Sequence, residues 1–253
     1  MLNFEFLMLN EKAIQNPSFN IQNQVVKKDI TSAMWWKVLA VIFLIYTVVA
    51  GFLMPVPALP ILHETIRNLY FHVCMWFAMM FILTVSLVYS IKFLMNPKED
   101  YDIIASQCAN TGMVFGVLGL ITGSLWAKYT LGAWWINDPK LNGAAITLLS
   151  YFAYIVLRSS MDDEQKRSRV SAVYNIFAYA MLIVFVMVYP RLSNVDSLHP
   201  GNGGNPGFNS YDLDSHMRLV FYPAILGWIF LCSWIAAINI RLERINRYNH
   251  NKI

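Results

Sequence analysis

Charged residues are scarce in this chain: they make up 13% of its 253 residues, whereas soluble domains carry about 25%. Because 57% of the residues are hydrophobic, the composition points to a membrane protein instead of a soluble domain. The net charge is only +4, and no dense basic patch alternates with aromatics, which argues against nucleic-acid binding.

Cysteine is also rare, and no two cysteines form a CxxC pair. The three thiols, at Cys74, Cys108 and Cys232, fall in or beside apolar runs, where cysteine usually acts as a small hydrophobe. A redox centre built on these residues is therefore not expected.

The first 33 residues lack the features of a cleavable signal peptide. Glu5 and Glu11 interrupt the early apolar residues, and no charged, apolar and small-residue regions follow in order. We interpret residues 1–33 as a cytosolic N-terminal extension.

Apolar runs long enough to span a bilayer, about 20 residues each, occur six times. They predict an all-α integral membrane protein, a bundle of six transmembrane helices within a membrane domain at 34–240, followed by a basic cytosolic tail at 241–253. The expected spans are 34–54, 70–95, 108–127, 142–160, 172–190 and 219–240. The third span carries four glycines in small-xxx-small spacing, which would let a neighbouring helix approach closely.

An even number of spans places both termini on one side, and positive residues favour the cytosol. With cytosolic termini, 14 of the 19 lysines and arginines lie inside. The remaining five lie outside: Arg67, Lys128, Lys140, Arg191 and Arg218. The outer side also receives the long polar loop 191–218, whose length suggests a functional role.

Histidines are the first candidates for chemistry on that side. His63 begins HETIR, which lacks the second histidine of the HExxH zinc motif because Arg67 stands there. His72 lies just inside the second span, where an ionisable group marks either a functional site or an interfacial histidine bonded to a backbone carbonyl. His199 alone could be a solvated loop residue, and Asp214 before His216 favours a helix cap there.

The stretch LGAWWINDPK (131–140) joins the third and fourth spans on the same outer side. Trp134 and Trp135 fit an interfacial aromatic belt, and Asp138 with Pro139 fits a helix start. Paired indoles beside a carboxylate in a short loop also suit a flat amphipathic ligand. Haem is one such ligand, and two histidines from different segments could hold its iron.

Three separate segments together resemble a known family. LGAWWINDPKLN is similar to the signature WGxWWxWDPRLT of the CcmC-type haem-handling proteins of cytochrome c maturation, the CcmC/CcsA tryptophan-rich family. LYFHVCMW around His72 resembles the first histidine motif of the family, and SLHPG with DLDSHMR resembles the second. The signature matches at Gly132, Trp134, Trp135, Asp138, Pro139 and Leu141.

Four positions depart from that signature. Leu131 and Asn137 replace tryptophans, Lys140 replaces arginine and Asn142 replaces threonine. The departures predict a smaller aromatic platform and the loss of a bidentate guanidinium fork.

The resemblance implies a haem-binding protein of the bacterial inner membrane that is not an enzyme, with its site on the periplasmic side. By resemblance, His72 and His199 are the axial ligands of haem b, and the tryptophans with Asp138 form a platform whose turn Gly132 and Pro139 shape. The implied partners are a CcmE-type haem chaperone and ABC-type Ccm subunits.

Other functions fit less well. A haem-attaching synthase would be an enzyme, but relatives of that kind have more spans and large outer domains. A haem b electron-transfer subunit would need histidine pairs inside the spans, and only His72 lies in one. A haem exporter permease subunit would need a series of charged residues to line a path through the membrane, and the predicted spans contain no such series.

Overall fold

The computed structural model describes residues 34–192, 197, 199 and 213–250. The chain divides into two compact units, residues 1–39 and 40–253. Residues 1–33, the predicted N-terminal extension, lie outside the described residues, as does most of the loop 191–218. The following account concerns the second unit.

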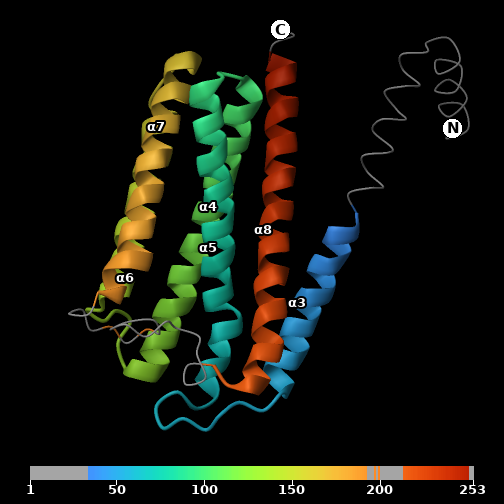
Figure 1. Cartoon of the computed structure of the whole chain (residues 1–253), viewed down its shortest axis with the longest axis vertical. Coiled ribbons are helices and arrows are strands. Elements are labelled where there is room, and N and C mark those ends of the chain that lie inside the picture. The colour runs from blue at the N-terminus through green and yellow to red at the C-terminus, as the bar shows by residue number, and fades with distance from the viewer. Residues whose placement is uncertain (1–33, 193–196, 198, 200–212, 251–253) are drawn as a thin grey trace, which may run out of the picture. The chain divides into compact units, whose positions relative to one another are not determined.

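The described residues are helical, with no strand among them, and six helices are long and apolar enough to cross a membrane. The predicted fold class is therefore confirmed (Figure 1). The helices are α3 (Trp35–Leu53), α4 (His72–Met95), α5 (Glu99–Leu131), α6 (Pro139–Ser159), α7 (Glu164–Leu182) and α8 (Ser215–His250). Shorter elements are the 3-10 helices η1 (His63–Tyr70) and η3 (Tyr189–Arg191) and the π-helix η2 (Ile183–Val188).

Most of the helices continue beyond the apolar runs that predicted them. Helix α5 begins at Glu99 instead of 108, because a first turn containing Glu99, Asp100 and Asp102 suits the positive end of a helix dipole. Helix α8 continues through the basic residues after 240 to His250, so the predicted boundary at 240 coincides with no break in the helix.

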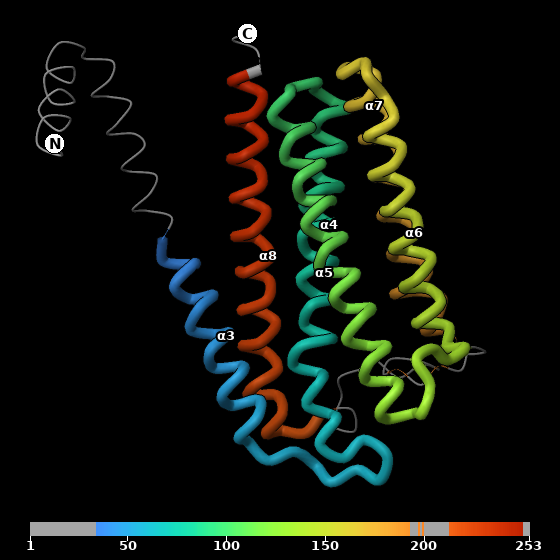
Figure 2. Tube along the Cα trace, turned by 180° about the vertical axis from the view of Figure 1, so that it is seen from behind, coloured from blue at the N-terminus to red at the C-terminus, as the bar shows by residue number. Residues whose placement is uncertain are grey.

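Helices α4 and α5 pack closely as an antiparallel pair, with α6 and α7 on one side and α8 on the other (Figures 1 and 2). One face of α4 lies on the glycine stripe of α5, as the glycine spacing predicted. A methyl group at any of these glycines would come within 3 Å of the α4 side chain opposite. From one end to the other, the pairs are Gly123 with His72, Gly119 with Trp76, Gly116 with Met79, and Gly112 with Leu83.

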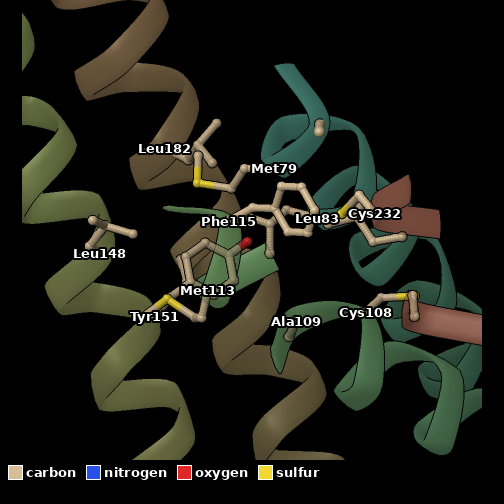
Figure 3. Packing of buried hydrophobic residues seen from close by; sticks show 14 of the residues in the cluster. Met79, Leu83, Cys108, Ala109, Met113, Phe115, Leu148, Tyr151, Leu182 and Cys232 are labelled. Atoms are coloured by element: carbon tan, nitrogen blue, oxygen red, sulfur yellow. The ribbon is translucent and has the colours of Figure 1, made fainter. Parts of the chain in front are cut away.

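The core between α4, α5, α6, α7 and α8 is apolar and rich in sulfur and aromatic side chains (Figure 3). Met79, Leu83, Tyr151 and Leu182 are almost completely buried in it. The outward faces are apolar as well, as at Leu149 and Phe152 of α6, which are exposed. An apolar exterior is what a lipid environment requires.

A charged cluster holds the helices together at the end away from His72. Arg158 of α6 donates two hydrogen bonds, of 2.8 and 2.6 Å, to the buried carboxylate of Asp102 on α5. Arg247 of α8 contacts Asp102, Glu99 and Glu164, so α5, α7 and α8 meet at one guanidinium.

Candidate functional site

The start of α6 is the centre of the candidate site. Helix α5 ends with Gly132 as its C-cap at φ 81°, a left-handed conformation that glycine adopts without strain. Helix α6 then begins with Asp138 as N-cap and Pro139 at its first position, as the sequence predicted. The Asp138 carboxylate accepts hydrogen bonds from the backbone N–H groups of Lys140 (2.9 Å) and Leu141 (3.2 Å).

Asp138 also binds the loop that carries the second histidine. Its Oδ1 atom accepts from Nδ1 of His199 at 3.0 Å, and its Oδ2 atom accepts from the Ser197 hydroxyl at 2.9 Å. The carboxylate is buried, with 3% of the side chain exposed, whereas the imidazole is about 30% exposed. One carboxylate therefore both caps α6 and positions His199.

His72 is the first residue of α4, and α4 begins at the same end of the bundle as α6 (Figure 1). Its Nδ1 atom lies 2.8 Å from the carbonyl oxygen of Gly119 on α5, with the Thr122 hydroxyl 3.3 Å away. The ring lies against Gly123, where an added methyl carbon would be 2.5 Å from Cε1. His199 is held by Asp138 at the start of α6, which follows the end of α5 that carries Gly119 and Gly123.

The protonation of both rings follows from these contacts. Carbonyl and carboxylate oxygens only accept hydrogen bonds, so Nδ1 must carry the proton in His72 and in His199 when the rings are neutral. Each Nε2 then has a lone pair, and no hydrogen bond to it comes from the part of the chain that the structure describes. This tautomer is the one suited to metal ligation through Nε2.

The two tryptophans lie on the surface of the connecting segment. Trp134 is 57% exposed and Trp135 43% exposed. The Trp135 indole N–H donates to Asn142 Oδ1 at 3.3 Å. The segment therefore offers flat apolar surface close to the residue that holds His199.

Two other histidines, His63 and His216, lie at the starts of helices. His63 begins η1 with a positive φ of 43°, and Arg67 in the same turn donates to the carbonyl oxygens of Gly51 and Met54 at 2.7 Å. His216 is exposed at the start of α8, where its N–H donates to Asp214 Oδ2 at 2.9 Å, as the predicted cap requires.

Among the described residues, no three His, Cys, Asp or Glu side chains gather as they would around a bare metal ion. A haem iron needs only two protein ligands, one on each face of the ring. His72 and His199 are the two candidate ligands, because Nδ1 of each lies against a protein oxygen and Nε2 is the nitrogen left to coordinate.

Several residues of this site were not foreseen from the sequence. Ser197, Gly119 and Thr122 contact the two histidines or their partner, and Asn137 and Asn142 contact each other. For Gly119 the only signal was the glycine spacing of the third span, which indicated close helix packing and not a contact with a histidine. Asn137 and Asn142 stood out as departures from the family signature, and Ser197 as part of SLHPG, but no contact was predicted for any of the three.

A known protein family matches most of this chain. The family model Heme exporter protein C (CcmC) matches residues 18–253. Heme exporter protein C of Bradyrhizobium diazoefficiens is 30% identical over 112 residues, which cover 44% of this chain and 43% of that protein. Its Escherichia coli counterpart is 24% identical over 140 residues, 55% of this chain and 54% of that protein.

A second group of relatives carries a different name. Cytochrome c biogenesis protein CcsA of Prochlorococcus marinus subsp. pastoris is 35% identical over 91 residues, 36% of this chain and 28% of that protein. The chain thus matches about half or less of the length of these curated relatives. Because the family match covers most of its residues, the chain belongs to the Heme exporter protein C (CcmC) family.

Proposed function

We propose that this protein binds haem b between His72 and His199 and presents it for cytochrome c maturation. The observation that carries the proposal is that Nδ1 of each imidazole lies against a protein oxygen, which makes Nδ1 the protonated nitrogen of the neutral ring. Each Nδ1–H is held by a protein oxygen, at 2.8 Å for His72 and 3.0 Å for His199, which leaves each Nε2 for iron. Such outer-shell bonds fix ring orientation and raise ligand basicity.

The tryptophan segment supplies the surface for the porphyrin. Large exposed indoles next to an axial ligand favour a flat apolar ring, and Trp134 and Trp135 are both exposed. Asp138 joins the two parts, since it holds His199 and also begins the helix that follows the indoles. The bound iron would supply the redox and ligand-exchange chemistry, and these residues bind and orient the ring.

Charge supports an outward-facing site. Among the described residues from 40 on, the site end of the bundle carries five lysines and arginines, at 67, 128, 140, 191 and 218, while the opposite end carries the charged cluster and nine, at 92, 98, 158, 166, 167, 169, 241, 244 and 247. Under the positive-inside rule the opposite end faces the cytosol. The site then faces the periplasm across a bacterial inner membrane, within reach of a soluble acceptor domain such as a CcmE-type haem chaperone, with ABC-type Ccm subunits beside the bundle.

The proposed activity is binding and transfer, not the making of a covalent bond. Among the described residues of the site, the side chains position imidazoles and indoles, and we assign none to a bond-making step. The alternative function is that of a component of a haem-attachment synthase; some relatives are named Cytochrome c biogenesis protein CcsA, a name that does not separate the two functions. Haem transfer and haem attachment differ in whether the purified protein, given haem and an apocytochrome, forms a covalent haem adduct by itself.

The test is a visible spectrum of the detergent-purified protein. We expect a six-coordinate low-spin haem spectrum in the wild type. His72→Ala and His199→Ala should each lose one ligand and retain less haem. His216→Ala is the matched control, since this exposed histidine at the same end contacts the cap of α8. If both single variants retain wild-type haem content and spectrum, the assignment of ligands is wrong.

A further inference from the structure

The Trp135 indole is tied to the helix that follows it. Its Nε1–H donates to Oδ1 of Asn142, at 3.3 Å, in the first turn of α6. Because a tryptophan side chain has one polar atom, this bond is the contact that selects an orientation for an otherwise exposed ring. No comparable bond is recorded for Trp134 in the described part of the chain.

Asn142 is itself held by a second asparagine. Its Nδ2 atom donates to Oδ1 of Asn137 at 2.8 Å. The two bonds fix the orientation of the Asn142 amide, because its Oδ1 accepts from the indole and its amino group donates to Asn137. Asn137 and Asn142 stand on either side of Asp138, the residue that holds His199.

A hollow borders this pair on the side of η2 and η3. Its volume is about 430 Å³, within the range of small-molecule pockets. Its lining includes Asn137, Asn142 and Pro139 at the start of α6, Phe185 of η2 and Tyr189 of η3. The pair is therefore open on that side, and Trp135 is 43% exposed, so the hydrogen bond to Asn142 constrains an indole that packing covers only in part.

We infer that Asn137 and Asn142 are positioning residues that set the Trp135 indole against the bound ring. The inference rests on the proposed haem site and extends it to two residues that do not contact the iron. Both are departures from the tryptophan-rich signature, and in the structure they are hydrogen-bonded to each other. The two residues therefore act together. Where the signature has a larger aromatic platform, this chain fixes the orientation of one indole by hydrogen bonds.

The first measurement follows the indole without haem. Protein labelled with 5-fluorotryptophan gives a fluorine resonance for Trp135, assigned by its absence in Trp135→Phe. Asn142→Leu removes both bonds and should shift or broaden this resonance. Asn142→Asp keeps an acceptor for the indole, and the Asn137 amide can turn to donate to it, so the resonance should stay near the wild-type position. Asn96→Ala, an exposed asparagine at the other end of α4, is the control.

The second measurement is haem affinity of the same proteins. Loss of one exposed neutral hydrogen bond should weaken binding by about two- to tenfold in Asn142→Leu and Asn137→Ala, and Asn142→Asp should restore it. The double variant Asn137→Trp with Asn142→Thr, which restores the signature at these two positions, should bind haem more tightly than Asn137→Trp or Asn142→Thr alone.

The outcomes distinguish a failure of this inference from a failure of the proposed haem site. An unchanged Trp135 resonance in Asn142→Leu overturns the inference, as does a shifted resonance with wild-type haem affinity. In both cases a wild-type haem spectrum leaves the proposed function standing. A wild type that binds no haem overturns the proposed function and the ligand part of the inference, while the resonance still shows whether the pair holds the indole.

Discussion

Asp138→Asn is the substitution that best separates haem binding from folding. The carboxylate caps α6 through two backbone N–H groups and accepts from Ser197 and His199. Asparagine is as good an N-cap as aspartate, so α6 should form normally. The oxygen that caps α6, Oδ1, is also the one that accepts from His199, so an amide oxygen can keep both contacts while the amino group takes the place of Oδ2 beside Ser197. The change instead weakens the bond to the imidazole, because a neutral carboxamide replaces a charged carboxylate as its acceptor.

The magnitude follows from the charge of the acceptor. A charge-assisted hydrogen bond to Nδ1 of His199 is replaced by a neutral one about half as strong, so the imidazole is held less firmly as a ligand. Mutation of such an outer-shell partner typically costs 10- to 100-fold in metal affinity, and we expect about that loss, equivalent to about 1.4–2.8 kcal/mol.

The assay is haem titration of detergent-purified protein, with thermal unfolding measured on the same samples. Asp138→Ala should add the loss of the cap, about 1 kcal/mol of stability, to the loss of haem affinity. Asp163→Asn is a matched control, because Asp163 caps α7 through the Lys166 N–H at 2.8 Å at the opposite end of the bundle. Wild-type haem affinity in Asp138→Asn, or an equal loss in Asp163→Asn, would refute the reasoning.

Two other changes test the packing around the site. Gly123→Ala would place a methyl carbon 2.5 Å from Cε1 of His72, so we expect about 1–3 kcal/mol of strain, a displaced ring and an altered low-spin spectrum. Asp102→Asn would leave the Arg158 guanidinium without its bidentate partner, and we expect about 3–5 kcal/mol lower stability by thermal unfolding. Since that cluster lies at the other end of the bundle, the haem affinity of the folded Asp102→Asn protein should not change; a large change would contradict the placement of the site.

Hydropathy predicted all six spans, but it could not locate most of their ends. It records which residues tolerate hydrocarbon, whereas a helix continues as long as its backbone bonds form and no residue ends it. Glu99 and Asp102 are polar yet lie in the first turn of α5 because they match the dipole there. Only where a specific cap exists, as at Asp138 and Pro139, did the sequence give the start of a helix to the residue.

The π-helix after α7 had no signal in the apolar run IVFVMV. In the structure it lies against Gly143 of α6, where a methyl group would come within 2.3 Å of the Phe185 carbonyl oxygen. The close approach of a wider helix needs a residue without a side chain opposite, so the cause is a tertiary contact. A single-span pattern carries no information about such a contact.

Candidate side chains were predictable, but their orientation was not. Topology alone brings His72, His199 and the tryptophan segment to one end of the bundle. The partner of His72 is a backbone carbonyl, which every residue possesses, so no sequence pattern could indicate Gly119. The departures from the signature at Asn137 and Asn142 did not predict the bond between these two residues, because that bond depends on where α6 begins.

The close spacing of the tryptophan segment has a physical explanation in the two helix ends that enclose it. Gly132 stops α5 in a left-handed conformation and Asp138 starts α6, so the intervening indoles belong to neither helix and stay exposed. The same aspartate must then satisfy two helical N–H groups, which fixes its carboxylate and makes it a rigid acceptor for the imidazole of His199. A rigid acceptor determines a tautomer more strongly than a mobile one, because the ring cannot turn without breaking the bond. Capping of α6 and preparation of the ligand are thus one interaction, which explains why the carboxylate and the indoles lie so close together in the chain while the histidines that they serve come from distant segments.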